Sequence, residues 1–170
     1  KKAGHEIIFG SREPTSPKSK DLARRFESDV GIRSFPEAVA EAELSVLAVP
    51  WSAAEDVIAH VAEWSGKVLV DATNPIGPGF VLELGHDDSG GEAIQRWANG
   101  ATVVKAFNTT GYNNMLDPQY QNEPTVMFVA GDDEAAKKVV LQLAEDLGFV
   151  SADLGDLSQS RLLEPLAMTW

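Results

Sequence analysis

The sequence contains no cysteine, which excludes disulfide bonds and thiolate metal sites. Long apolar runs are also missing: none approaches the roughly 20 residues of a membrane-spanning helix, and no basic segment leads into an apolar one as in a secretory signal. Positive charge is scarce, with 14 Lys and Arg against 26 Asp and Glu, and this balance argues against nucleic acid as the main partner. We therefore expect a cytoplasmic protein that binds neither nucleic acid nor a membrane.

The length and the composition favour one folded unit. The 170 residues are 44% hydrophobic and 24% charged, which is enough to bury one sizeable core, and length favours one domain over two. The sequence starts at Lys1 without a Met and stops at Trp170, where the apolar periodicity of a helix is still running. We therefore expect a single domain over residues 1–170, as a fragment of a longer protein that is truncated at both ends.

Short apolar, β-branched runs alternate with helical patterns along the chain, as in a parallel sheet covered by helices. Most of these runs are almost continuously apolar, which is expected of strands whose two faces are both covered. The sequence thus predicts an α/β fold with a doubly wound, mostly parallel sheet of the Rossmann type. Strands are predicted at residues 5–10, 32–35, 44–50, 67–73, 102–108, 125–131 and 149–155.

Helix boundaries are visible in two places between these strands. Ser52 is followed three residues later by Glu55, a capping-box pattern that predicts a helix starting there. The Pro and Gly content of residues 74–91 predicts a long loop that ends in a helix cap at Ser89. Further helices are predicted over residues 19–28 and from Asp132 or Asp133 to Gly148.

A cluster of basic and hydroxyl residues follows the first predicted strand in this acidic chain, which suggests a local anion. In a doubly wound dinucleotide fold, the end of the second strand lies beside the adenosine ribose, where an acidic residue binds the hydroxyls of NAD. Here that position offers Ser11 and Arg12, and Lys18 and Lys20 lie close enough in sequence to add charge. A hydroxyl and an Arg fork can hold a 2′-phosphate that a carboxylate would repel, which indicates NADP(H). The alternative is a solvated loop before a helix.

Four predicted strand ends form a recognisable set, in order and at consistent spacing: "GSR", "AVPW", "DATNP" and "KAFNTT". With these motifs the chain resembles the dinucleotide-binding oxidoreductases related to the NADPH-dependent deazaflavin reductase, also called deazaflavin-dependent NADP oxidoreductase. It resembles the reductase domain of the STEAP metalloreductases more distantly. The resemblance covers essentially the whole chain and implies an NADP-dependent oxidoreductase.

Members of that family begin with a strand and a Gly-x-Gly-x-x-Gly turn, and this sequence contains neither. The turn normally holds the pyrophosphate on a helix N-terminus, and the strand lies at the centre of the sheet order 3-2-1-4-5-6. We therefore expect a sheet that lacks its first strand. The strands at 5–10 and 44–50 should then be separated by a gap or should pair directly.

The ends of two further strands are candidate cofactor contacts, because ligands of open α/β sheets bind outside the carboxyl ends of the strands. The resemblance implies that the backbone of Ala48, Val49 and Pro50 runs along the cofactor, although Pro50 could simply start the next helix. Asn74 and Pro75 end the next strand, where an amide could bind ribose or nicotinamide. The alternative there is a turn-forming Asn-Pro pair.

The segment after the strand at 102–108 is the richest in neutral hydrogen-bonding groups. Ala106 is expected at the cofactor, and Asn108, Thr109 and Thr110 at the substrate that receives the hydride. Neutral groups suit a planar ring that has to be oriented rather than protonated. Lys105 is the charged candidate in this strand; it reaches a carboxylate or phosphate or extends to water, and we favour a structural role.

Neither a catalytic residue nor a metal site is predicted. No pair among His5, His60 and His86 has metal-ligand spacing, and the sequence holds neither a Ser-His-Asp arrangement nor a nucleophile elbow. Met168 and Pro75 are expected on the apolar side of the acceptor pocket, and Trp170 could border it.

For the longer protein of which this chain is expected to be a fragment, the leading functional prediction is hydride transfer between NADP(H) and a small-molecule acceptor, either a deazaflavin or a flavin. Such a transfer needs no acid-base residue. Two alternatives stay open: a dehydrogenase of the pyrroline-carboxylate reductase or hydroxyacid type, and an NADP(H)-binding redox sensor without turnover. A homodimer is one option for the assembly.

Overall fold

A five-stranded sheet forms the centre of the computed structural model, which describes residues 4–26 and 30–169. Its strand order is β11-β10-β7-β4-β3. The first three of its strands along the chain run parallel, whereas β10 is antiparallel to β7 and parallel to β11, so the sheet is mostly parallel as predicted. The strands are β3 (Leu44–Leu47), β4 (Val68–Asp71), β7 (Thr102–Lys105), β10 (Val126–Gly131) and β11 (Val150–Asp153).

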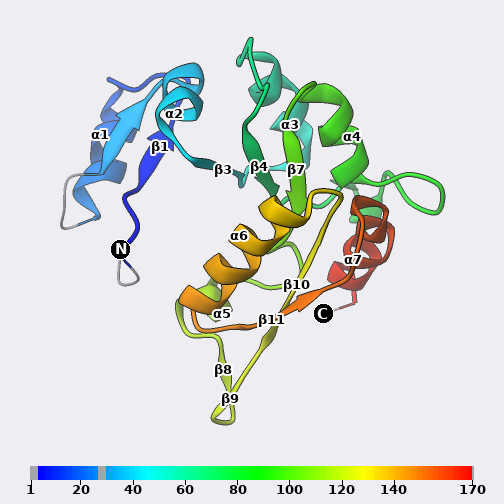
Figure 1. Ribbon diagram of the computed structural model, residues 1–170. Helices are drawn as coiled ribbons and strands as arrows, with labels where there is room; N and C mark the ends of the chain where they lie inside the picture. The colour runs from blue at the N-terminus through cyan, green and yellow to red at the C-terminus, as the bar shows by residue number, and fades with distance from the viewer. Residues whose placement is uncertain (1–3, 27–29, 170) are drawn as a thin grey trace.

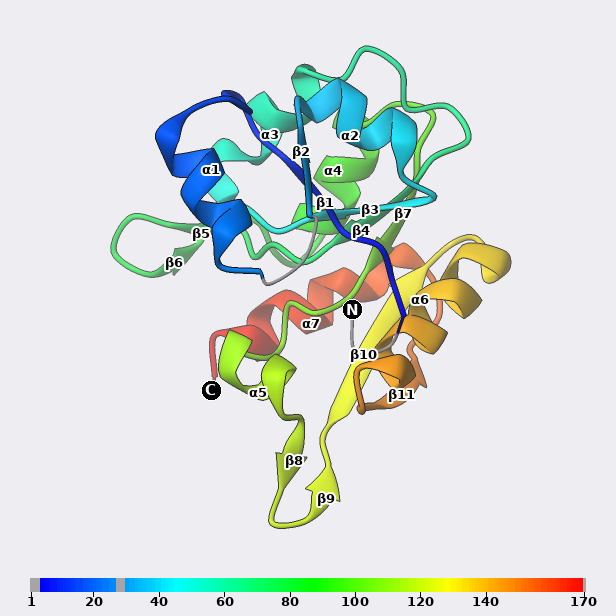
Figure 2. The same ribbon diagram turned by 90° about the vertical axis from the view of Figure 1, so that its left-hand side faces the viewer.

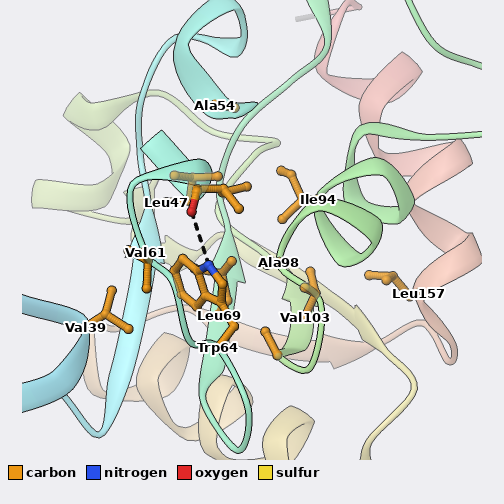
Figure 3. Close-up of a cluster of buried hydrophobic side chains, with 12 residues drawn as sticks. Val39, Leu47, Ala54, Val61, Trp64, Leu69, Ile94, Ala98, Val103 and Leu157 are labelled. Carbon is orange, nitrogen blue, oxygen red and sulfur yellow. Dashed lines mark hydrogen bonds between the residues drawn. The ribbon is translucent and has the colours of Figure 1, made fainter. Parts of the chain in front are cut away.

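Both faces of this sheet are buried, because successive apolar side chains in a strand point to opposite sides. Leu69 and Val103 belong to a core cluster that includes residues of α3 and α4, shown in Figure 3. Val70 and Val104 belong to a second cluster with residues of α6. The helices concerned are α3 (Trp51–Ala59), α4 (Gly90–Trp97) and α6 (Glu134–Asp146).

The first part of the chain forms a second, two-stranded parallel sheet, in which Ile8 pairs with Gly31. In the described part of the chain β1 pairs with β2 alone and β3 with β4 alone, so the predicted gap between the two strands is confirmed. Figure 1 shows this block beside the main sheet. It comprises β1 (Ile8–Gly10), α1 (Pro17–Arg24), β2 (Gly31–Arg33) and α2 (Phe35–Glu41).

The capping box predicted at Ser52 is wrong. Helix α3 begins at Trp51 after the extended residue Pro50, so Ser52 lies inside the first turn, and no side chain of the described residues caps this helix end. A capping box is present instead at Ser34 and Glu37, at the start of a helix that the sequence did not predict.

Other helix ends lie where the sequence predicts them. Ser89 caps α4, and Asp133 caps α6 by accepting a hydrogen bond from the Ala136 amide at 2.8 Å. Gly148 follows α6 with φ +96°, the left-handed conformation that favours glycine after a helix. These capping residues fix where the two helices start and where α6 stops.

Short elements occupy the long connections. Residues 74–91 contain a two-stranded hairpin, and a helical turn and a second hairpin lie between β7 and β10. No helix within residues 4–26 and 30–169 is long and apolar enough to cross a membrane. The remaining elements are β5 (Ile76–Gly77), β6 (Val81–Leu82), α5 (Tyr112–Leu116), β8 (Gln119–Tyr120), β9 (Glu123–Pro124), η1 (Leu157–Gln159) and α7 (Ser160–Ala167).

Candidate active site

The parallel strands β3, β4 and β7 end level with one another. Leu47 lies opposite Asp71, and Asp71 lies opposite Lys105, as register partners. The residues that follow these three strands therefore emerge at one edge of the sheet, which is where open α/β sheets bind ligands.

A buried group of three charged side chains lies at this edge. The Lys105 Nζ atom is 2.7 Å from Asp71 Oδ2 and 2.7 Å from Glu164 Oε1, and it donates a further hydrogen bond to the Thr73 carbonyl at 2.7 Å. At most 1% of any of the three charged residues is exposed. Lys105 thus reaches carboxylates and has the structural role that the sequence favoured.

Both carboxylates are held by further donors. Asp71 Oδ1 accepts hydrogen bonds from the Thr73 amide at 2.8 Å and the Thr73 hydroxyl at 2.7 Å. The Glu164 carboxylate accepts from the amides of Gly90 and Gly91, at 2.8 and 3.0 Å, and so caps the first turn of α4. Burial raises the pKa of the Glu164 carboxyl, and the Lys105 ammonium opposes that effect.

A side chain on either of the two glycines at this helix start would crowd α7. A Cβ atom on Gly91 would lie 2.6 Å from Ser160 Oγ, and one on Gly90 would lie 3.0 Å from Glu164 Oε1. Two residues without side chains thus allow α7 to approach α4 closely enough for the carboxylate to reach both amides. Figures 1 and 2 both show α7 below α4, with which it is in contact.

Two asparagines join the ends of β4 and β7. Asn108 Nδ2 donates to Asn74 Oδ1 at 3.0 Å and to the Leu163 carbonyl at 3.1 Å, and Asn74 Nδ2 donates to the Asn108 carbonyl at 2.9 Å. Because both neighbours of Asn108 Nδ2 are acceptors, the orientation of this amide is determined. Asn108 Oδ1 is buried and has no hydrogen-bond partner among the described residues. The unsatisfied group of the Asn108 side chain is therefore an acceptor, and both of its amide hydrogens are used within the protein.

The remaining predicted residues at this edge differ in exposure. Pro75 and Ala106 are buried, Thr109 and Thr110 are half-buried, and Met168 is half-buried at the end of α7. Between Ala106 and Asn108 the buried Phe107 has a φ of +64°, an unusual conformation for a bulky residue that turns the chain sharply after β7. Trp170 lies outside the described residues.

The predicted contacts after β3 lie at the surface of the same edge. Ala48 and Pro50 are exposed and Val49 is half-buried. Pro50 is the residue before α3, so the alternative that it starts the helix is confirmed, and its contact with the cofactor stays a prediction. The structure thus brings the ends of β3, β4 and β7 together, as the sequence analysis required.

The basic loop follows β1, in the separate two-stranded block. The Ser11 amide donates to the Arg33 carbonyl at 2.8 Å, and Ser11 Oγ accepts from the Glu13 amide at 3.2 Å. Lys18 is exposed in the first turn of α1. The Arg12 guanidinium extends to α3, where its Nη2 atom is 3.1 Å from Asp56 Oδ2.

Residues 1–75 match a family model described as "NADP oxidoreductase coenzyme F420-dependent". The F420-dependent NADP reductase of Methanothermobacter thermautotrophicus is 32% identical over 182 residues, which cover 96% of this chain and 76% of that protein. The chain belongs to the F420-dependent NADP oxidoreductase family.

A crystal structure from this family agrees with that assignment. It is of an Arthrobacter protein described as an F420-dependent NADP reductase, 32% identical to this chain with a TM-score of 0.86, and the match covers 96% of this chain and 80% of that one. The Rossmann-type fold and the resemblance are confirmed. At the level of the F420-dependent NADP oxidoreductase family, the expectations of an NADP-dependent oxidoreductase and of NADP(H) with a deazaflavin are confirmed too.

The more distant resemblance to the STEAP metalloreductases is also confirmed. The rat metalloreductase STEAP3 is 29% identical over 167 residues. The match covers 98% of this chain, which spans only 32% of the length of that relative.

Sequence reasoning missed three charged residues of the site. Asp71 and Glu164 hold Lys105, and Asp56 holds Arg12. A signal for Asp71 was available, because a carboxylate at the end of one apolar strand and a Lys at the end of the next suggest a buried pair. Nothing local in the sequence marks Glu164 or Asp56, since each looks like a residue on the solvated face of a helix.

Proposed function

We propose that this chain binds NADP(H) and supports hydride transfer between its nicotinamide and a deazaflavin of the coenzyme F420 class. The observation that carries the proposal is the chemistry of the β4 and β7 ends. The charged groups there are paired with one another and buried, while a neutral asparagine pair joins the two strand ends and leaves one buried acceptor unsatisfied. Such an edge can orient a ring and supplies no side chain for proton transfer.

The residues after β1 and at the end of β7 fit the 2′-phosphate and the nicotinamide of NADP(H). The exposed Arg12 guanidinium and the Ser11 hydroxyl lie directly after β1, where an NAD-binding fold has a carboxylate. Lys18 adds positive charge from the first turn of α1, the next element along the chain. An unsatisfied buried carbonyl such as Asn108 Oδ1 costs about 1–3 kcal/mol, and an N–H group of a ligand would remove that cost. The nicotinamide carboxamide carries such a group.

When bound, the nicotinamide and the deazaflavin supply the hydride donor and acceptor, and the protein has to hold the two rings close together in the right orientation. Asn108 Oδ1 would accept the carboxamide N–H, and Asn74 fixes the Asn108 backbone and side chain in place. Pro75 and Ala106 would provide an apolar surface, with Ala48, Val49 and Pro50 along the dinucleotide. Thr109 and Thr110 would face the second ring.

The proposal is tested by mixing the protein with NADPH and a deazaflavin without oxygen and following the deazaflavin absorbance. We expect the deazaflavin band to bleach in step with NADPH oxidation, and a flavin to be reduced more slowly. Reduction of a cyclic imine or an oxoacid instead would identify a dehydrogenase, and tight NADPH binding with no turnover would identify a sensor; either result would replace the proposal.

The cytoplasmic location and the homodimer also stay predictions. Cell fractionation tests the first, and light scattering of the purified chain at several concentrations tests the second.

A further inference from the structure

The ion pair between Arg12 and Asp56 joins two parts of the molecule that lie in different sheets. Arg12 follows β1 in the two-stranded block, and Asp56 lies on α3, which packs on the five-stranded sheet. The block containing β1 lies in front of α3 in Figure 2. Both side chains are more than half exposed, 58% for Arg12 and 57% for Asp56. A ligand from solution can therefore reach the pair.

The Asp56 carboxylate is directed at Arg12 rather than at its nearer neighbour on the helix. His60, one turn later on α3, bonds through Nδ1 to the Asp56 carbonyl oxygen at 2.6 Å and stays 3.9 Å from Asp56 Oδ1. The other carboxylate oxygen, Oδ2, is the one that contacts Arg12 at 3.1 Å. The guanidinium thus already holds an anionic oxygen supplied by the protein itself.

We infer that Asp56 stands in for the 2′-phosphate on Arg12 and thereby sets the affinity and the selectivity for NADPH; this rests on the proposed function. An exposed ion pair is weak and easily exchanged. A phosphate dianion offers three acceptor oxygens and makes stronger, bidentate contacts with the same fork. The 2′-phosphate therefore displaces Asp56, and the displaced carboxylate lowers the net gain of binding.

Two effects of Asp56 on a 2′-phosphate have the same sign. The carboxylate competes for the guanidinium, and its negative charge repels the dianion that replaces it. Neutralising Asp56 should consequently tighten binding of any nucleotide that carries a 2′-phosphate. A nucleotide without that phosphate does not need Arg12 and should be unaffected.

The test compares adenosine 2′,5′-bisphosphate with 5′-AMP, two probes that differ only in the 2′-phosphate, by titration calorimetry on the full chain. In Asp56→Asn we expect the dissociation constant of the bisphosphate to fall by about two- to fivefold, the scale of one exposed ion pair. The dissociation constant of 5′-AMP should not change.

Glu55→Gln is the matched control. It removes the same charge from the adjacent position of α3, where Glu55 is exposed, and should leave both dissociation constants nearly unchanged. An equal tightening in Glu55→Gln would show a general charge effect and overturn the inference. Weaker bisphosphate binding in Asp56→Asn would overturn it as well, because Asp56 would then position Arg12 rather than compete for it.

A double variant tests whether the effect of Asp56 on bisphosphate binding acts through Arg12. In an Arg12→Ala background, Asp56→Asn should no longer tighten bisphosphate binding, and a tightening that persists would contradict the competition. A wild-type chain that binds the two probes equally would also overturn the inference. The deazaflavin assay decides the proposed function separately, since turnover can be measured at saturating NADPH.

Discussion

The two halves of the candidate site use charge in opposite ways. At the ends of β4 and β7, Lys105 and its two carboxylates are at most 1% exposed and are fully engaged with the protein. After β1, Arg12 and Asp56 are both more than half exposed and form a single contact. The buried charges hold the ends of β4 and β7 against α4 and α7, and the exposed charges are available for exchange with a ligand.

The physical reason for this division is the cost of desolvation. A charge taken out of water needs permanent partners, and removing one partner leaves the others uncompensated. An exposed charge keeps most of its hydration, so its protein partner can leave at little cost. Changes in the buried group should therefore act on stability, and changes in the loop after β1 on ligand selection.

The largest effect should come from Lys105→Met. The substitution leaves two buried carboxylates without a counter-charge, so we expect the free energy of unfolding to fall by about 3–5 kcal/mol in urea denaturation. Lys138→Met, at an exposed position of α6, is the control and should cost less than about 0.5 kcal/mol. Equal free energies of unfolding for the two variants would mean that the buried charged group does not stabilise the fold.

Arg12→Asp should have the next largest effect, on cofactor choice rather than on stability. It places a carboxylate where the 2′-phosphate would bind, and we expect the NADPH preference over NADH to fall by about 10- to 150-fold. Dissociation constants for both cofactors measure this. If their ratio stays as in the wild type, the loop after β1 does not select the cofactor.

Thr109→Leu tests the segment after β7, where the hydride acceptor is expected to bind. The bulky side chain should displace the second ring and lower turnover with a deazaflavin by about 10- to 100-fold, while NADPH affinity stays nearly the same. Steady-state kinetics and NADPH titration separate the two effects. Loss of NADPH binding would assign this segment to the cofactor, and unchanged turnover would move the acceptor elsewhere.

The smallest effect concerns two carboxylates near the start of α4 with opposite pKa shifts. Burial raises the pKa of Glu164, so its contribution to stability is greatest below the unfolded value of about 4.3 and is lost as pH rises through the folded pKa. The hydrogen bond from Arg161 lowers the pKa of Glu92, so its contribution is present above that value and is lost as pH falls through the folded pKa.

Denaturation of the Glu164→Gln and Glu92→Gln variants across pH 3.5–7 (about the titration range of carboxylates) checks both signs. The stability deficit of Glu164→Gln relative to the wild type should shrink as pH rises. That of Glu92→Gln should shrink as pH falls. Parallel pH profiles for the two variants would contradict the difference in their environments.

The seven strands of the five-stranded sheet and of the β1–β2 sheet were predictable from the sequence, most of them because a strand in a covered sheet is a nearly continuous apolar run, such as Val68–Asp71 in β4. The gap beside β3 followed from the sheet order of the fold. Helix α2 was missed although Ser34 and Glu37, three residues apart, have the sequence pattern of a capping box. The hairpins were missed because strands of two residues leave no periodic pattern.

The candidate site was only half predictable, for a different reason. Asn74 and Asn108 are polar residues that follow shortly after the apolar strands β4 and β7, so their place at the sheet edge could be inferred, and the structure pairs them. Glu164 could not be found in this way, because its partners Gly90 and Gly91 are 74 and 73 residues away in sequence. Contacts of that range depend on the tertiary fold and leave no local signature.

The cap that Glu164 places on α4 also sets an order of events during synthesis. A ribosome releases residues 90–97 long before residue 164, so the first turn of α4 and the charge of Lys105 must wait for α7 to emerge. Closing so long a loop is entropically unfavourable until the contact forms, which makes it a late step. In a nascent chain arrested before α7, the start of α4 and Lys105 should therefore lack their contacts with Glu164, and the main strands should be less stably packed. These contacts should form once the last helix leaves the ribosome.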